Sequence, residues 1–320
     1  MFEFKTNNFF IKEEIKKYLE NIIKTKSFAN GYVFFGAEGL GKRQTALQFI
    51  KDIFNEYSTS TNISEKVMNN NHPDYLMIQP NYLIKSKSPK NADSEKLKNN
   101  NAGIIKIDQI RKIKTFLSQK SIESEKKIVL IIDAHLLNEA ASNCLLKTLE
   151  EPSNGIFILL TSQLNLLLDT VRSRCQLVRF KSFSSSQIKS HLKNNLDSSQ
   201  LKITQRLDFQ DLVNSANGSP GKIINNIEIW NELSDEIINK LESPIKNSIE
   251  ILKISKLISE KLEIYQQIYL LQLVQHMWWT KTRNINLVKK LETLKNQIKK
   301  NIQPRLAWEV NLLKIAIEDL

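Results

Sequence analysis

The chain has 320 residues, with 46 Lys and Arg against 34 Asp and Glu, so its formal net charge is +12. This length predicts two or three domains, and the 41% apolar and 25% charged fractions exclude a chain that is disordered throughout. The surplus of cations suits a polyanionic partner such as nucleic acid. The two cysteines form no metal-binding pair, and no apolar run is long enough to cross a bilayer. We therefore expect a cytoplasmic protein that makes no membrane contact.

Short apolar strands alternate with amphipathic helices over the first 180 residues. The expected strands are 32–35, 75–78, 128–132 and 156–161, and the expected helices are 42–54, 107–117 and 139–149. This alternation predicts an α/β domain with a parallel sheet covered by helices, in which ligands bind at the carboxyl ends of strands. Residues 81–103 are rich in Lys, Asn and Ser and predict a solvated insertion, for which a neutral surface loop is favoured over an arm touching DNA.

Helical periodicity replaces the strand pattern from residue 181 onward. We expect a small helical lid over 181–235, closed by a turn at 218–221 with one following helix, and an all-α domain over 236–320. One apolar stripe runs along the last helix at intervals of four and three residues. Its members are Leu306, Val310, Leu313, Ile317 and Leu320. The pattern leaves open whether the stripe packs inside this chain or against another subunit.

A phosphate-binding loop follows the first strand. Gly36, Gly39, Gly41 and Lys42 lie in a segment that fits the pattern G-x-x-x-x-G-K, in which backbone N–H groups surround phosphates and the Lys neutralises them. The next position should be a Ser or Thr whose hydroxyl holds Mg²⁺, but Arg43 stands there. A guanidinium has no lone pair for a metal, so the loop is degenerate.

The acidic strand is altered as well. Two successive acids would be needed, one to support Mg²⁺ and one to orient the attacking water, whereas this strand ends Ile132-Asp133-Ala134. Asp133 matches the second acid when counted from the following helix and the metal acid when counted from the strand start. Either register lacks a required group. We expect a nucleotide site that is vestigial or that binds ATP without turnover.

Four further motifs follow the loop in order, and together they carry a family resemblance. They are His72-Pro73-Asp74-Tyr75, the segment 107–111, the segment 140–152 that ends Leu-Glu-Glu-Pro, and Ser173-Arg174-Cys175. In combination they resemble the bacterial clamp-loader family, the AAA+ subunits of DNA polymerase III, and within it the delta prime type. The resemblance covers about residues 5–180 strongly. The turn at 218–222 resembles the second-sensor region of the family and 301–313 resembles its final collar helix, while the resemblance between these two segments is thin.

The resemblance implies a role for several residues. Arg174, flanked by Ser173 and Cys175, would project as an arginine finger into the ATP site of an adjacent subunit, and the alternative is a surface cation in a basic stretch. Thr161 or Ser162 matches the first sensor of the family. Cys175 is expected to be a small packing residue. The four-cysteine zinc module of many members is absent, so no metal site is expected.

The resemblance also implies an assembly and a function. The AAA+ domain (1–180), the lid and a collar (236–320) would join clamp-loader motor and delta subunits in a hetero-pentameric ring that meets the sliding clamp and primed DNA. The chain itself would not be an enzyme, although the complex has DNA-directed DNA polymerase activity. No cofactor is required, and ATP binding is left open. The alternatives are an active AAA+ ATPase motor subunit and a free DNA-binding protein.

Overall fold

The computed structural model describes most of the chain, and its described residues form two compact units. These residues are 11–58, 62–81, 103–150, 155–188, 216, 218–232, 234–300 and 302–318. The first unit comprises 1–182 with 219–221, and the second comprises 183–218 with 222–320. The division of the second part into lid and collar stays a prediction, because most of the proposed lid lies outside the described residues. The 81–103 insertion lies outside them too, except at its ends.

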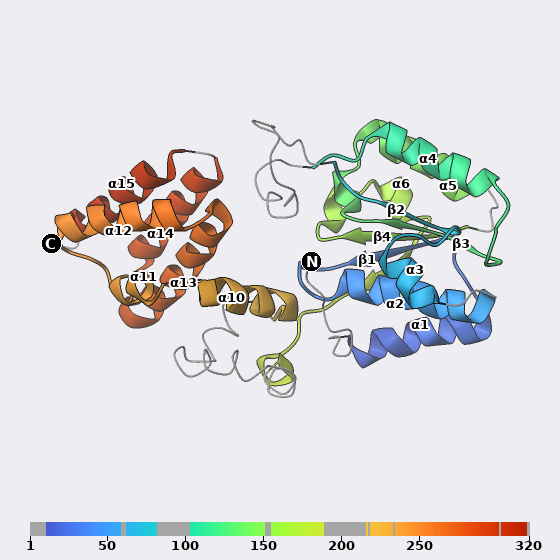
Figure 1. Cartoon of the computed structure of the whole chain (residues 1–320), viewed down its shortest axis with the longest axis horizontal. Helices are drawn as coiled ribbons and strands as arrows, with labels where there is room; N and C mark the ends of the chain where they lie inside the picture. Colours follow the sequence, from blue (N-terminus) through green and yellow to red (C-terminus); the bar gives the residue numbers. More distant parts are fainter. Residues whose placement is uncertain are drawn as a thin grey trace. The chain divides into compact units, whose positions relative to one another are not determined.

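The first unit is built on a five-stranded parallel sheet (Figure 1). Its strands are β1 (Gly31–Phe35), β2 (Tyr75–Ile78), β3 (Lys127–Ile131), β4 (Gly155–Thr161) and β5 (Gln176–Arg179). Their order across the sheet is β2-β3-β4-β1-β5. The last residues of β1 and β4, Phe35 and Thr161, pair with each other, and β3 ends at Ile131, which pairs with Leu159 two residues before the end of β4. This register brings the segments that follow β1, β3 and β4 to one edge of the sheet.

Helices cover both faces of this sheet (Figure 1). One face carries α4 (Ile107–Ser118) and α5 (Glu139–Glu150), and the other carries α1 (Glu13–Thr25), α2 (Lys42–Tyr57) and α3 (Ile63–Met68). The short helices η1 (Ala134–Leu136), η2 (Leu164–Leu166) and α6 (Asp169–Arg172) follow strands β3 and β4. Every residue of β3 and β4 is buried, as expected for strands covered on both faces.

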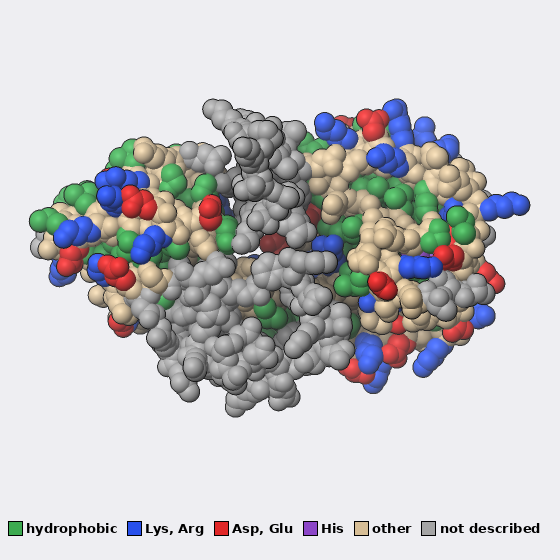
Figure 2. Space-filling model, viewed as in Figure 1, with side chains coloured by type: hydrophobic (Ala, Val, Ile, Leu, Met, Phe, Trp, Pro, Cys, Tyr) green, Lys and Arg blue, Asp and Glu red, His purple; other side chains and the backbone are tan. Residues whose placement is uncertain are grey.

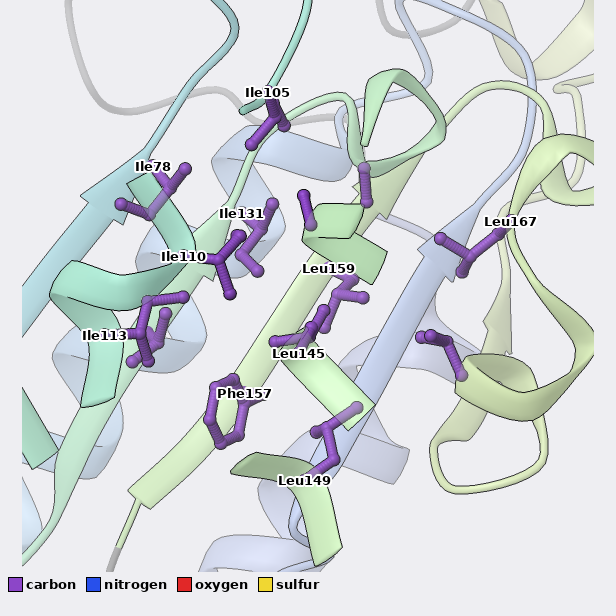
Figure 3. Close-up of a cluster of buried hydrophobic side chains, with 14 of the residues drawn as sticks. Ile78, Ile105, Ile110, Ile113, Ile131, Leu145, Leu149, Phe157, Leu159 and Leu167 are labelled. Carbon is purple, nitrogen blue, oxygen red and sulfur yellow. The ribbon is translucent and has the colours of Figure 1, made fainter. Parts of the chain in front are cut away.

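A buried apolar cluster joins α4 and α5 to the sheet (Figure 3). Ile110 and Ile113 of α4 and Leu145 of α5 are fully buried against sheet residues such as Ile131 and Phe157. This packing fixes the carboxyl-terminal end of α5 on a rigid frame. The architecture confirms the predicted α/β class, and it adds α1, α3 and the edge strand β5 to the expected elements.

The second unit contains helices only, within its described residues. Residues 185–188 are helical. The helices with assigned bounds are α10 (Pro220–Glu232, whose first two residues belong to the first unit), α11 (Asp235–Lys240), α12 (Ser248–Lys261), α13 (Ile264–Thr282), α14 (Ile285–Lys299) and α15 (Pro304–Glu318). α12 packs against α15, and α14 packs against both α13 and α15. None of the described helices combines the length and apolar character needed to span a membrane.

Two buried tryptophans anchor the core of this unit. The indole N–H of Trp278 donates to the Leu241 carbonyl at 2.9 Å, and that of Trp308 donates to Gln267 Oε1 at 3.0 Å. Buried Trp N–H groups need such partners. Both rings are fully buried, so Trp278 and Trp308 are core residues of this unit.

The apolar stripe of the last helix lies on the surface. Leu306, Val310 and Ile317 are 51%, 39% and 69% exposed, whereas Trp308 and Leu312 of the same helix are buried. α15 is thus apolar on two faces, and the face that carries Trp308 and Leu312 makes the internal contacts. Leu320 lies outside the described residues. Hydrophobic side chains are visible among Lys and Arg side chains at the surface of the second unit (Figure 2).

Candidate functional site

The phosphate loop joins the carboxyl end of β1 to the amino end of α2. Gly36, Gly39 and Gly41 have φ values of 148°, 74° and 81°, which side chains rarely adopt, so the loop depends on glycine. Lys42 Nζ donates to the carbonyl oxygens of Gly36 and Ala37, each at 2.6 Å. The ammonium is therefore held against the start of the loop, and α2 begins directly after it. This arrangement suits an anion at the helix amino end.

The side chains that should hold Mg²⁺ are not in place. Arg43 is exposed on the first turn of α2, and Thr45, two residues further, is 2% exposed. The Thr45 hydroxyl donates to the Gly41 carbonyl at 2.9 Å within its own helix. Because this hydroxyl is buried against the helix backbone, it does not replace the missing metal ligand.

The carboxyl ends of β3 and β4 bring the predicted Asp133 and Thr161 to the same edge as the loop. The backbone N–H of Gly36 donates to the Thr161 carbonyl at 3.3 Å. The Ile132 N–H still donates to Ile78 in the sheet, at 2.9 Å, whereas Asp133 leaves the sheet with a φ of 52°. Ile132 is therefore still within the sheet and Asp133 is the first residue beyond it, and the functional register of this strand end stays a prediction.

His135 was missed by the sequence reasoning and lies within this group. Its Nδ1 lies 3.3 Å from Thr161 Oγ1, which also accepts the Gln163 N–H at 3.0 Å. Burial lowers the pKa of His135, while the charges of Asp133 and Glu38 raise it and Lys42 lowers it. The imidazole therefore lies beside Thr161 at the end of β4, and its position two residues after Asp133 in the sequence was the available signal.

Residues 219–221, which belong to the first unit, contact the phosphate loop directly. The Ser219 hydroxyl donates to the Glu38 carbonyl at 2.8 Å, and the Gly221 N–H donates to the Gly39 carbonyl at 2.9 Å. A Cβ atom on Gly221 would lie 2.9 Å from both Cα and O of Gly39, closer than real Cβ contacts. The loop tip is thus covered by a segment about 180 residues away in sequence.

Arg174 lies at the other end of the sheet. Cys175 directly precedes β5, whose first residue pairs with Tyr32 near the start of β1. The Cys175 Sγ lies beside Gly31, the first residue of β1, since a Cβ atom added to Gly31 would be 2.7 Å from it. The phosphate loop follows Phe35 at the far end of β1. Four residue steps at about 3.3 Å each place the two ends about 13 Å apart. The structure therefore does not bring the Ser-Arg-Cys motif together with this chain's own loop.

The Arg174 guanidinium is held by two contacts. Nη1 donates to the Thr170 carbonyl at 3.0 Å, and Nη2 forms an ion pair with the Glu150 carboxylate at the end of α5. Its neighbour Ser173 is exposed, and the Ser173 hydroxyl donates to the same Thr170 carbonyl at 3.1 Å. The Arg174 side chain is 39% exposed, so the guanidinium is oriented and still accessible.

Cys175 has the environment of a packing residue. Burial raises the pKa of its thiol to about 11, and the side chain packs against the buried cluster of the sheet. A thiol of this kind is mostly protonated at neutral pH and is a weak nucleophile. No group of three His, Cys, Asp or Glu side chains among the described residues could hold a metal ion.

His72 and Asp74 organise the loop before β3. The His72 ring stacks on Phe54 with 4.0 Å between ring centroids. The fully buried Asp74 carboxylate accepts the backbone N–H groups of 122–124 at 2.7–3.1 Å. Backbone bonds to a buried carboxylate satisfy its charge. The His-Pro-Asp motif of this chain therefore has a structural role.

Comparison with known proteins identifies relatives for both units. The family model described as DNA polymerase III, delta subunit matches residues 11–184. A second model, cyanobacterial DNA polymerase III delta prime, C-terminal domain, matches residues 186–315.

Two relatives from Bacillus subtilis (strain 168) match part of the chain. DNA polymerase III subunit delta' is 30% identical over 188 residues, 57% of this chain and 51% of the relative. DNA polymerase III subunit tau is 28% identical over 201 residues, 61% of this chain and 32% of the relative. The matched region thus spans about half the length of the first relative and a third of the second.

A solved structure of similar fold comes from Thermotoga maritima. It is a DNA polymerase III, gamma subunit-related protein with a TM-score of 0.54 and 18% identity, covering 94% of this chain and 98% of that one. At this identity the likeness shows the fold alone.

Proposed function

The chain belongs to the delta and delta prime subunit family of DNA polymerase III, and on that premise we propose that it is a non-hydrolysing delta-prime-type subunit of a clamp loader. It would join motor and delta subunits in a hetero-pentameric ring, help to load the sliding clamp onto primed DNA, and supply Arg174 to the ATP site of a neighbour.

The position of Arg174 is the observation that carries the proposal. Because the Ser-Arg-Cys motif and the phosphate loop lie at opposite ends of β1, about 13 Å apart by strand length, the guanidinium does not serve this chain's own loop. It is nevertheless accessible and fixed in orientation by Thr170 and Glu150. A fixed guanidinium that serves no site of its own chain suits a phosphate presented by another subunit.

The degenerate loop supports the absence of turnover. The chain retains Lys42 and the glycine-dependent curvature of the loop, but Arg43 replaces the Mg²⁺ hydroxyl and the Thr45 hydroxyl bonds to its own helix. At the end of β3, Asp133 is the single acid where hydrolysis needs two. With metal and water positioning both impaired, the loop would at most bind nucleotide.

The surface stripe of α15 supports assembly through the helical unit. Leu306, Val310, Leu313 and Ile317, called here the α15 stripe, form one apolar face, and all of them except Leu313 are exposed. Exposed apolar faces of this kind mark protein interfaces. We assign the α15 stripe to contact with the helical regions of neighbouring ring subunits.

Steady-state ATP hydrolysis by the purified chain tests the proposal. We expect no turnover above background at saturating ATP and Mg²⁺, with and without primed DNA. Phosphate release that Lys42→Ala abolishes would contradict the proposal and favour a working motor subunit, because a contaminating ATPase would not respond to that substitution.

A further inference from the structure

Arg174 is tied to a carboxylate from a different helix. Glu150 is the last residue of α5, and its carboxylate pairs with Nη2 of Arg174, which follows α6. The nearby Arg172 differs, because it pairs with Asp169 inside its own helix, three residues away. The Glu150–Arg174 pair therefore links Arg174 to a different element, α5, whereas the Arg172–Asp169 pair stays within α6.

The helix that carries Glu150 is rigidly seated. Leu145 and Leu149 of α5 are 0% and 3% exposed within the cluster that packs on the sheet (Figure 3). The carboxylate is thus attached to the buried frame of the unit. Arg174 is restrained by two contacts, Nη2 with the Glu150 carboxylate and Nη1 with the Thr170 carbonyl.

The two contacts leave most of the guanidinium available. A guanidinium carries five N–H donors, and among the described residues the Thr170 carbonyl and the Glu150 carboxylate each take one. Five donors exceed these two contacts, so within the described part of the chain N–H groups remain for a phosphate. The geometry therefore allows Arg174 to bind a phosphate while it stays paired with Glu150.

We propose that Glu150 is a positioning residue for Arg174, holding the guanidinium in the orientation in which it meets a neighbour's nucleotide. This inference rests on the proposed function. Both side chains are partly exposed, at 52% for Glu150 and 39% for Arg174, so the pair contributes little to stability. The ion pair restricts the rotamers of the long Arg174 side chain. The Arg174 guanidinium is therefore ordered before the neighbouring subunit binds.

Clamp loading by the reconstituted complex tests the inference through a double-mutant cycle. The variants are Glu150→Gln, which keeps the shape and removes the charge, Arg174→Ala, and the two combined. Glu139→Gln, at the exposed first turn of the same helix, is the matched control. All four are compared with the unsubstituted chain at equal assembly, with the thermal midpoint of each chain measured alongside.

We expect Glu150→Gln to lower the clamp-loading rate about twofold to fivefold, the range that corresponds to an exposed ion pair. The KM for ATP and the thermal midpoint should not change, because Glu150 touches neither nucleotide nor core. In the Arg174→Ala background, Glu150→Gln should have no further effect, since nothing is left to position. Glu139→Gln should behave as the unsubstituted chain.

The outcomes separate this inference from the proposed function. If Arg174→Ala loads clamps at the unsubstituted rate, the arginine finger itself is wrong and the inference falls with it. If Arg174→Ala is slow but Glu150→Gln is normal, only the positioning role is wrong. If Glu150→Gln still slows clamp loading in the Arg174→Ala background, Glu150 does not act through Arg174 and the positioning role is wrong. If Glu150→Gln loads clamps faster, the carboxylate hinders the finger, which also contradicts the positioning role.

Discussion

Replacing the α15 stripe with glutamine should separate assembly from folding. The triple variant Leu306→Gln, Val310→Gln and Ile317→Gln changes side chains that are 51%, 39% and 69% exposed. Glutamine is a good helix former, and surface substitutions usually alter the free energy of unfolding by less than about 0.5 kcal/mol each. Burying the exposed part of each side chain in an interface is worth about 1 kcal/mol, roughly half of full burial.

Loss of three such contributions should weaken assembly by about 3 kcal/mol, or roughly a hundredfold in Kd. The assay is the affinity of the chain for purified motor and delta subunits, measured by mass photometry or surface plasmon resonance. Lys314→Gln, an exposed change on the same helix, is the matched control. Leu312→Ala, at a side chain 1% exposed, should instead cost about 2–5 kcal/mol of stability. Unchanged affinity of the triple variant would refute the assignment of the stripe.

Three further predictions concern the first unit. Gly221→Ala should displace the turn from Gly39, because the new Cβ would lie 2.9 Å from the Gly39 backbone. We expect the free energy of unfolding, measured by urea titration, to fall by about 1–3 kcal/mol, and an unchanged value would show that the contact is dispensable. Asp74→Asn should lower the free energy of unfolding by about 3 kcal/mol, because a neutral amide cannot accept all the N–H groups of 122–124. An unaltered urea midpoint would argue against the structural role of Asp74. At pH 8 a thiol of pKa about 11 is ionised in roughly one molecule per thousand. Iodoacetamide should therefore label Cys175 far more slowly in the native chain than in the denatured chain, as measured by peptide mass spectrometry. Equal labelling rates would contradict the burial of Cys175.

The four strands with apolar sequences were predictable, including the edge strand β2, whereas the exposed edge strand β5 was not. β1 to β4 give continuous apolar runs because helices cover both sides. β5 lies at the edge with three of its four residues exposed, so its sequence lacks that signal. α1 was predictable in principle, since Ile15, Leu19 and Ile22 are spaced by four and three residues and are buried.

Sequence alone could not decide which face of α15 is internal. Leu306, Val310 and Ile317 form one apolar stripe, and Trp308 and Leu312 belong to another. Both have helical spacing. Only the packing of α12 and α14 against the helix selects the second stripe as the core face and leaves the first at the surface.

The parts of the site within short segments were predictable, and those made by distant segments were not. The glycine-rich loop, Lys42 and the unusual Arg43 follow directly from a motif. The contact of Ser219 with the loop joins residues 181 apart. The distance of Arg174 from its own loop likewise depends on the pairing of β5 with β1, which no local pattern contains.

The most direct test of the central claim compares two variants in the reconstituted clamp loader, Arg174→Ala and Lys42→Ala, each only in this subunit. Action in trans predicts that Arg174→Ala lowers DNA-stimulated ATP hydrolysis in part and slows clamp loading more strongly, while Lys42→Ala leaves both rates at the unsubstituted level. Arg174→Lys should fail as well, because an ammonium lacks the bidentate fork. The opposite pattern, with normal rates for Arg174→Ala and a loss of hydrolysis for Lys42→Ala, would mean that this chain turns over ATP at its own loop, and it would contradict the account.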